Sequence, residues 1–163
     1  MLQVRTATLN DLPAIVDIYN ATIPGRMVTA DTEPVTAESR MDWFYSHTDM
    51  RPLLVATEGS EILGWLSFKS FYGRPAYSGT AEVAIYLRKQ AQGKGYGNRL
   101  LQYILDLSPA LHLHTLLGFI FAHNQPSLQL FKKFGFEQWG YLPQVAVLDG
   151  QYRDLVIVGR KVG

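Results

Sequence analysis

The feature that most constrains the fold is the repeated change between helical and strand periodicity along the chain. Leu12, Ile15, Val16 and Tyr19 follow the i, i+3, i+4, i+7 spacing of one helix face, behind a predicted N-cap at Asn10. Short apolar runs between Gly, Pro and polar residues predict strands. These runs cover residues 3–6, 53–57, 62–71, 80–87, 116–121, 136–141 and 155–158. This alternation predicts an α/β sheet with helices on both faces, and not a bundle or a sandwich.

The region between the first two predicted helices has no regular period. Residues 23–33 contain Pro24-Gly25 and are predicted to form a loop. Thr36 can then cap a second helix, whose apolar side would carry Met41, Phe44 and Tyr45. With two later helices, the predicted order is β α α β β β α β α β β.

The composition limits the possible functions. The chain has 163 residues, which suits one domain covering 1–163, and 15 basic against 14 acidic side chains leave a net charge of +1. This near balance gives no basic field for nucleic acid. The absence of cysteine excludes disulfides, zinc–thiolate sites and a cysteine nucleophile. Since no signal peptide, membrane-spanning run or metal motif is recognised, we expect a cytoplasmic protein without a metal or a membrane partner.

The segment that follows the predicted strand at residues 80–87 is the most informative for function. It reads Gln92-Gly93-Lys94-Gly95-Tyr96-Gly97-Asn98 and lies between a strand and a helix. Glycines there permit unusual backbone angles and the close approach of a ligand, and N–H groups at a helix N-terminus bind phosphate. The spacing fits neither a P-loop, which needs Ser or Thr after Gly-Lys, nor a dinucleotide fingerprint, which needs a third glycine. A glycine-rich turn without a ligand is the alternative.

Several separated motifs occur in an order that resembles one family. Gln92-x-x-Gly95-x-Gly97 resembles the coenzyme A pyrophosphate loop of the GNAT superfamily of N-acetyltransferases. Arg74-Pro75-Ala76-Tyr77 with Thr80-x-Glu82, and Asn124-Gln125-Pro126-Ser127 with Phe134-Gly135-Phe136, are similar to segments of its phosphinothricin and methionine sulfoximine N-acetyltransferases. The resemblance spans nearly the whole chain. Residues 145–153 depart from that subfamily, which leaves the substrate open.

The resemblance implies a GNAT-type mixed sheet that is splayed near its middle and holds acetyl-CoA in the gap. The pantetheine arm would bond to the backbone of Ile85, Tyr86 and Leu87 like an added strand. Asn124 would lie near the pantetheine or the thioester, and a plain helix N-cap is its alternative role. Phe131 stands beside the cofactor where many relatives have a tyrosine that acts as a general acid. Because phenylalanine cannot donate a proton, we assign no acid.

Glu82 is the predicted general base. It interrupts an otherwise apolar strand, where a solvated carboxylate is not expected. An α-amino group with a pKa of about 8 needs a base to lose its proton before it attacks a thioester. The alternative is a polar residue on the solvent face of the strand. A backbone N–H of Tyr86 or Leu87 could polarise the thioester carbonyl.

The resemblance places Glu33, Arg74, Tyr77 and Ser78 at the acceptor site. Arginine pairs with carboxylates through two parallel hydrogen bonds, so Arg74 is expected to anchor an acidic acceptor; an exposed turn arginine is the alternative. The expected reaction moves an acetyl group directly from acetyl-CoA to the primary amine of a small amino-acid-like molecule. Transfer to a polyamine, peptide or protein amine, and an idle coenzyme A-binding module, are the alternatives. The resemblance also implies a homodimer.

Overall fold

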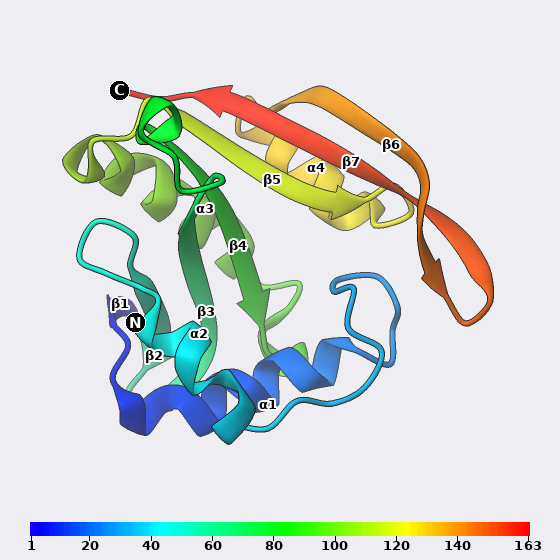
Figure 1. Cartoon of the computed structure of the whole chain (residues 1–163). Helices are drawn as coiled ribbons and strands as arrows, with labels where there is room; N and C mark the ends of the chain where they lie inside the picture. Colours follow the sequence, from blue (N-terminus) through cyan, green and yellow to red (C-terminus); the bar gives the residue numbers. More distant parts are fainter.

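The computed structural model describes all 163 residues, and a seven-stranded sheet runs through it in the order β1-β2-β3-β4-β5-β7-β6 (Figure 1). The strands are β1 (Leu2–Thr6), β2 (Leu53–Glu58), β3 (Glu61–Ser70), β4 (Thr80–Leu87), β5 (Thr115–Phe121), β6 (Glu137–Leu148) and β7 (Gln151–Lys161). The helices are α1 (Leu12–Thr22), α2 (Met41–Tyr45), α3 (Tyr96–Leu107) and α4 (Gln125–Lys133). The observed order of strands and helices is the predicted one, and the mixed α/β sheet is confirmed.

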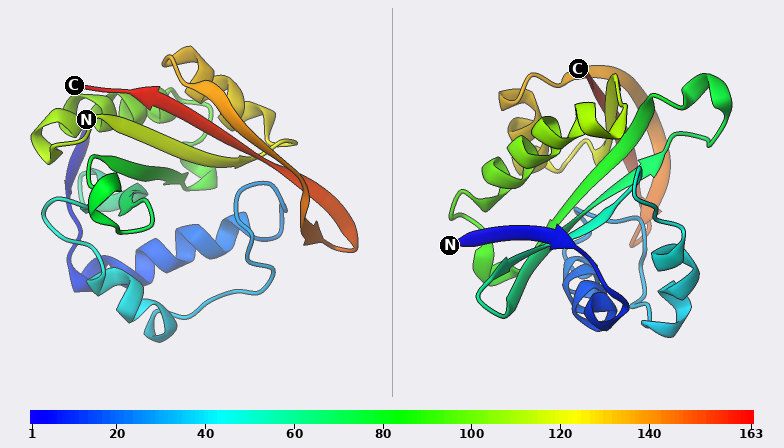
Figure 2. Two further views of the ribbon diagram at one scale, coloured as in Figure 1. Left: turned by 45° about the horizontal axis from the view of Figure 1, so that its top comes forward. Right: turned by 90° about the vertical axis from the view of Figure 1, so that its left-hand side faces the viewer.

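The sheet is split between β4 and β5, which form its one parallel pair. These strands pair only where residues 80–82 lie opposite 115–117. β4 stays paired with β3 as far as Leu87, and β5 stays paired with β7 as far as Phe121, so the two half-sheets diverge beyond the short pairing (Figures 1 and 2). The expected splayed sheet is therefore confirmed. From Val83 onward, one edge of β4 has no neighbouring strand, which leaves backbone N–H and C=O groups open to a ligand.

Helices cover both faces of the half-sheet that ends in β4, as the right-hand view of Figure 2 shows. Alternate residues of a strand point to opposite faces, so neighbours in β3 join different clusters. Leu66 and Phe68 pack with Ile104 of α3 in the main core, whereas Trp65 packs with Ile15 of α1 on the other face. Each such apolar side chain contributes about 1.5–3 kcal/mol through burial, which fixes the helices against the sheet.

The entry into α1 differs from the prediction. Asn10 is not the N-cap, because the chain enters the helix through a short 3₁₀ turn at Leu9–Asp11. The Asp11 carboxylate accepts the Thr8 N–H at 2.7 Å and pairs with Arg5 at 2.7 Å. The buried carboxylate of Asp11, one residue after Asn10, therefore accepts the hydrogen bonds at the start of the helix.

Helix α2 is only partly as predicted. Thr36 does not cap α2 itself, whose N-cap is Arg40. The Thr36 hydroxyl oxygen accepts the Ser39 N–H at 3.1 Å, at the 3₁₀ turn Glu38–Arg40 that leads into α2. Met41 and Tyr45 were expected on the buried side, but both are exposed. They lie four residues apart and so share one helix face. Of the three predicted residues, only Phe44 packs against the cluster under α1.

The hairpin of β6 and β7 is longer than the predicted strands 136–141 and 155–158, and it extends past the rest of the sheet (Figure 1). Its pairing is interrupted between Leu142 and Ala146. Pro143 in this interval has no N–H to donate, and Gln144 adopts a φ of +53°. This bulge breaks the alternation of apolar and polar residues, so the strand predicted from that alternation ended before the bulge.

Candidate active site

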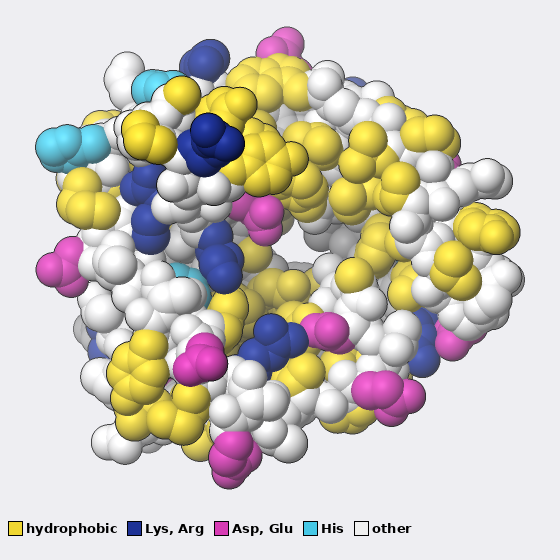
Figure 3. Space-filling model, viewed as in Figure 1, with side chains coloured by type: hydrophobic (Ala, Val, Ile, Leu, Met, Phe, Trp, Pro, Cys, Tyr) yellow, Lys and Arg dark blue, Asp and Glu magenta, His cyan; other side chains and the backbone are white.

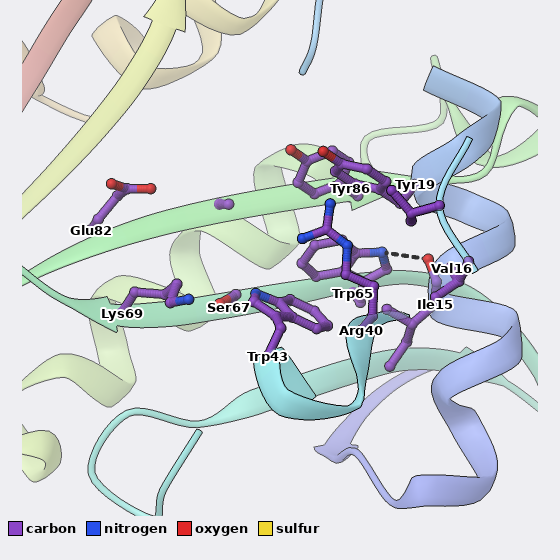
Figure 4. Close-up of a pocket in the computed structure, with 12 residues that line it drawn as sticks. Ile15, Val16, Tyr19, Arg40, Trp43, Trp65, Ser67, Lys69, Glu82 and Tyr86 are labelled. Atoms are coloured by element: carbon purple, nitrogen blue, oxygen red, sulfur yellow. Dashed lines mark hydrogen bonds between the residues drawn. The ribbon is translucent and has the colours of Figure 1, made fainter. Parts of the chain in front are cut away.

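Two cavities share Tyr86 of β4. The larger, of about 540 Å³, opens along the unpaired part of β4 and is called here the glycine-loop cleft. The smaller, of about 160 Å³, lies on the face of β3 and β4 that α1 and α2 cover, and is called the aromatic pocket (Figure 4). Because one residue borders both, a molecule in the cleft and a molecule in the pocket can meet beside β4.

The glycine-loop cleft is lined by β4, the glycine-rich loop, α4 and the end of α1 with the loop after it. Its residues are Thr22, Met27, Val28, Ile85, Tyr86, Leu87, Gln92, Gly93, Gly95, Gly97, Asn98, Asn124, Pro126, Ser127, Leu130 and Phe131. They include ten of the twelve residues predicted to bind the cofactor. The other two lie outside: Lys94 is exposed, and the Tyr96 hydroxyl donates to Glu58 at 2.9 Å. Met27 and Val28 were missed, because nothing in their loop marks them.

Two glycines in left-handed conformation shape the loop at the N-terminus of α3. Gly93 has a φ of +74° and Gly95, the N-cap, a φ of +82°. Residues with a Cβ rarely adopt these angles. A Cβ on either glycine would meet no atom within 4 Å, so the space beside the backbone is open. The first N–H groups of α3 have no partner within the helix, and the helix dipole makes this end positive, so the loop fits a pyrophosphate.

The open edge of β4 supplies the second part of the cleft. Ile85, Tyr86 and Leu87 line the cleft in the part of β4 that has no pairing with β5. An extended ligand arm that carries amide groups can bond to such an edge as a strand does. The fold thus brings the residues predicted for strand-like pairing and the residues predicted for pyrophosphate binding into one cavity.

The loop after α1 is fastened across the cleft by bonds from the second half-sheet. Asn124 is the N-cap of α4, because its Oδ1 accepts the Ser127 N–H at 3.3 Å. The same side chain donates from Nδ2 to the Met27 carbonyl oxygen at 3.1 Å. Arg26 pairs with Asp149, in the turn of the β6–β7 hairpin, at 2.9 Å. Both contacts hold the loop between the two halves of the sheet.

The aromatic pocket combines rings and charges from four elements. It is lined by Ile15, Val16, Tyr19, Val35, Arg40, Trp43, Trp65, Ser67, Lys69, Glu82, Ala84 and Tyr86 (Figure 4). Tyr86 stacks on Trp65 with 4.4 Å between ring centroids, and Trp43 meets Trp65 edge-on at 5.4 Å. In the space-filling view, acidic and basic side chains border the hollow at the centre of this face (Figure 3). The pocket can therefore receive a small polar molecule with an apolar part.

Glu82 faces this pocket together with Ala84 and Tyr86, because alternate residues of β4 share one face. It is half-buried, so it does not lie on an open solvent face. Burial raises the pKa of the Glu82 carboxyl above its ordinary value, and the positive charge of Lys69 opposes this rise. A carboxylate with a raised pKa accepts a proton more readily near neutral pH than an exposed one does.

One wall of the pocket is held by a charged network. The Tyr19 hydroxyl donates to the Asp31 carboxylate. Arg40 pairs with the same carboxylate at 2.8 Å, and its guanidinium carbon lies 5.2 Å from the centre of the Tyr19 ring. These contacts connect α1, the loop after it and the start of α2, so they keep the wall closed over β3.

A neutral histidine behind the pocket holds two of its lining residues, Trp43 and Ser67. The Nδ1 atom of His47 lies 3.0 Å from the Trp43 carbonyl oxygen, so this nitrogen carries the proton. The Nε2 atom then accepts the Ser67 hydroxyl at 2.8 Å. Burial lowers the pKa of His47, which keeps the ring uncharged. Trp43 and His47 lie one helical turn apart, but nothing in the sequence connects them with Ser67, so this arrangement was missed.

The residues predicted to hold the acceptor line neither cavity. Glu33, Arg74, Tyr77 and Ser78 are all exposed on two loops. Glu33 lies two residues before Val35 of the pocket, and Ser78 lies four residues before Glu82. They therefore stand next to the pocket in the sequence, and their side chains form no part of its wall.

Phe131 is buried where its ring borders the cleft. It packs edge-on against Phe136, with ring centroids 4.9 Å apart. No cluster of three or more His, Asp or Glu side chains is arranged to hold a metal ion. No helix is long and apolar enough to cross a membrane.

Comparison with known proteins identifies the family. Residues 12–136 match the family described as acetyltransferase (GNAT). The chain belongs to this family. The acetyltransferase is 53% identical, over 99% of each chain, to YwnH of Bacillus subtilis, provisionally named a phosphinothricin acetyltransferase. It is 32% identical, over 95% of its own length and 91% of the relative's, to an L-methionine sulfoximine/L-methionine sulfone acetyltransferase of Pseudomonas paraeruginosa.

The fold leads to the same family. A crystal structure of a GNAT superfamily phosphinothricin acetyltransferase from Sinorhizobium meliloti, in complex with acetyl-CoA, superposes with a TM-score of 0.92. It is 26% identical, and the match covers 99% of this chain and 89% of that one. The prediction of an N-acetyltransferase, made from separated motifs, is confirmed.

Proposed function

We propose that the acetyltransferase moves an acetyl group from acetyl-CoA to the primary amine of a small amino-acid-like molecule, with Glu82 as general base. The observation that carries this proposal is the position of Glu82 in a pocket that meets the glycine-loop cleft at Tyr86. Relatives named for phosphinothricin and for methionine sulfoximine support an acceptor of this size and chemistry. Residues 1–163 would act as one domain, in the cytoplasm.

The cleft would hold the donor in two parts. The pyrophosphate would lie against the loop 92–98, where open backbone N–H groups and the positive end of α3 favour a dianion. The pantetheine arm would run along the open edge of β4 at residues 85–87. This arrangement brings the thioester toward Tyr86, where the cleft meets the pocket.

The reaction then needs two protons removed from the nitrogen and one bond exchanged. Glu82 accepts a proton from the ammonium group, directly or through water, and the nitrogen lone pair attacks the thioester carbonyl. A backbone N–H of Tyr86 or Leu87 stabilises the oxyanion. The carbon–nitrogen bond forms, and the nitrogen releases its second proton to solvent. The carbon–sulfur bond breaks, and coenzyme A leaves as a thiolate that takes a proton from solvent. Phe131 cannot supply that proton, and we propose no general acid.

Glu33, Arg74, Tyr77 and Ser78 stay proposed contacts of the acceptor. They lie on loops that flank the pocket in sequence, so they would act on the part of the acceptor that projects from it. An arginine at such a site would pair with an exposed carboxylate or phosphinate.

A homodimer is proposed because one sheet face has no helix over it. The half-sheet β5-β7-β6 exposes Phe119, Trp139 and Leu142 on this face, and Figure 3 shows apolar side chains gathered there. A continuous apolar patch of this kind is typical of an interface. In light scattering, Phe119→Glu should lower the dimer fraction, and Met50→Glu, at an equally exposed residue outside the patch, should not.

The function is tested by two measurements on the wild-type protein. Acetyl-CoA at a hundredfold excess over its Kd should raise the free energy of unfolding by about 2.7 kcal/mol and increase the Tm accordingly. Release of free thiol from acetyl-CoA should depend on an added amine, in a panel of L-amino acids, methionine sulfone and polyamines. Binding without thiol release for any amine would support an idle coenzyme A-binding module. Spermidine as the preferred amine would move the acceptor to the polyamine class.

A further inference from the structure

Lys69 places a positive charge inside the aromatic pocket without forming an ion pair. The chain forms four ion pairs, and Lys69 takes part in none of them. The other basic residue of the pocket, Arg40, is already bound to Asp31. A cation without a partner that lines a partly enclosed cavity is available to an anionic group of a ligand.

The position of Lys69 relative to Glu82 is fixed by the sheet. The two residues lie directly opposite each other in the β3–β4 ladder, and both line the pocket. Residues paired in this way have β-carbons about 5 Å apart. Figure 4 shows the Lys69 side chain running along β3 toward Ser67, while the Glu82 carboxyl points away from it. The pocket therefore presents a positive and a negative group side by side without an ion pair between them.

This pair of charges matches one feature of the proposed acceptor. An α-amino acid carries its ammonium and carboxylate groups on the same carbon atom, so one small molecule can present an opposite charge to each of the two side chains. When the amine lies at Glu82, the carboxylate falls within reach of the Lys69 ammonium, and the side chain can extend toward the aromatic rings. A polyamine would bring a second cation toward Lys69, which is unfavourable.

We propose that Lys69 binds the α-carboxylate of the acceptor and thereby selects free α-amino acids over other amines. This inference rests on the proposed function and adds a specificity-determining residue to it. It differs from the expectation for Arg74, which is exposed and lies outside the pocket. It also gives a reason for a charged residue on the covered face of β3.

The test compares two substrates that differ only in the carboxylate. Acetylation of L-methionine sulfone and of the amine obtained by its decarboxylation is measured at matched concentrations of free base. In Lys69→Met, which keeps the apolar stem and removes the charge, the ratio of the two kcat/KM values should fall roughly ten- to hundredfold, mainly through a higher KM for the amino acid. Lys69→Arg should keep part of the preference. Lys132→Met removes a lysine charge from the exposed side of α4 and should leave the ratio unchanged.

Two results would overturn the inference. The first is an unchanged ratio in Lys69→Met; if both kcat/KM values fall equally, Lys69 acts only through Glu82 or the fold. The second is loss of the preference in Arg74→Ala but not in Lys69→Met. If the wild type acetylates neither compound although acetyl-CoA raises its Tm, the proposed function itself fails. If Lys69→Met does not fold, Lys69→Gln is measured in the same way.

Discussion

The glycine-loop cleft and the aromatic pocket differ in what makes them. The cleft takes much of its wall from residues 85–98, where an open strand edge and the φ angles of Gly93 and Gly95 create the shape. The pocket takes its wall from side chains of α1, α2, β3, β4 and a loop. A site formed by backbone conformation is confined to one stretch of sequence, whereas a site formed by side chains exists only after the fold has assembled it.

This difference implies a division of roles. The cleft offers backbone groups that suit a donor shared by a whole family, and the pocket offers particular side chains that suit one acceptor. Substitutions in the pocket should therefore change the use of the acceptor and leave acetyl-CoA binding intact. Substitutions in the cleft should do the reverse.

The largest effect is expected for Glu82→Gln. Loss of the general base should lower kcat by ~10²–10⁴-fold at neutral pH, and the deficit should shrink as the pH rises and free amine accumulates. The Kd of acetyl-CoA should stay the same, because Glu82 does not line the cleft. Thiol release and calorimetry measure the two quantities. Glu61→Gln, at an exposed residue of β3, is the matched control. An equal loss of acetyl-CoA affinity would show that the two cavities are not separable.

The pH dependence of the wild type sharpens the same point. Because burial raises the pKa of Glu82, the acid limb of kcat/KM should lie above the value of about 4.3 for an ordinary glutamate, and activity is lost as the pH falls through it. In Lys69→Met the opposing charge is absent, so the limb should move to still higher pH. Ionised Glu82 also costs folding free energy above its ordinary pKa, so Glu82→Gln should melt no lower than the wild type at pH 7. An acid limb at the pKa of an ordinary glutamate would contradict the inference that burial raises the pKa of Glu82.

The next effect concerns Gly95. Gly95→Leu should weaken acetyl-CoA binding at least about tenfold, or 1.4 kcal/mol, because a side chain would occupy the space beside the loop. Gly150→Leu is the matched control: it has a φ of +77°, no atom within 4 Å of a Cβ, and a place outside the cleft. Both variants should lose about 1–2 kcal/mol of stability through the left-handed conformation. If calorimetry gave Gly95→Leu and Gly150→Leu equal affinities for acetyl-CoA, the pyrophosphate would not bind at this loop.

The comparison also explains what could be predicted from the sequence. The cleft residues from Gln92 to Asn98 carry a motif, since glycines at fixed spacing report a backbone shape, and the family resemblance implied Ile85, Tyr86 and Leu87. Glu82 was found because a carboxylate interrupts an apolar strand. Lys69 gave no such signal, because a lysine near the end of a strand resembles any solvent-facing residue. That it faces α2 and Glu82 depends on the order of the strands and on the side of the sheet that α1 takes.

The fold follows the same rule. Elements whose residues alternate or repeat regularly were predicted with their order, including the split sheet that the family resemblance implied. The β6–β7 hairpin was cut short because the bulge at 142–146 shifts its period. Asp11 was missed as the cap because Arg5, which pairs with it, lies on a strand that the local pattern does not connect with the helix. Contacts between elements decide such cases.

A smaller effect is expected where the loop after α1 is tied to the cleft. Asn124→Asp keeps the oxygen that caps α4 but loses the N–H donated to Met27, so it should cost about 1 kcal/mol and raise the KM for acetyl-CoA severalfold. Asn124→Ala loses the cap as well and should cost about 1 kcal/mol more. Chemical denaturation measures both, and hydrogen exchange of the Val28 amide reports the loop. An Asn124→Asp protein as stable as the wild type would show that the Met27 contact contributes nothing.

The smallest effect is expected for Phe131→Tyr, which adds a hydroxyl where many relatives have a catalytic tyrosine. A thiol has a pKa of about 8.5, so the thiolate can leave without a proton from the protein. The change in kcat should therefore stay under about threefold, or ~0.7 kcal/mol of the barrier. Phe136→Tyr is the control, because Phe136 packs against Phe131 but does not line the cleft. It measures the effect of an added hydroxyl in the core when no hydroxyl is added at the cleft. A tenfold rise in kcat at saturation with both substrates would show that departure of the thiolate limits turnover. The cleft would then take part in the chemistry and not only in binding, and the division between the two cavities would fail.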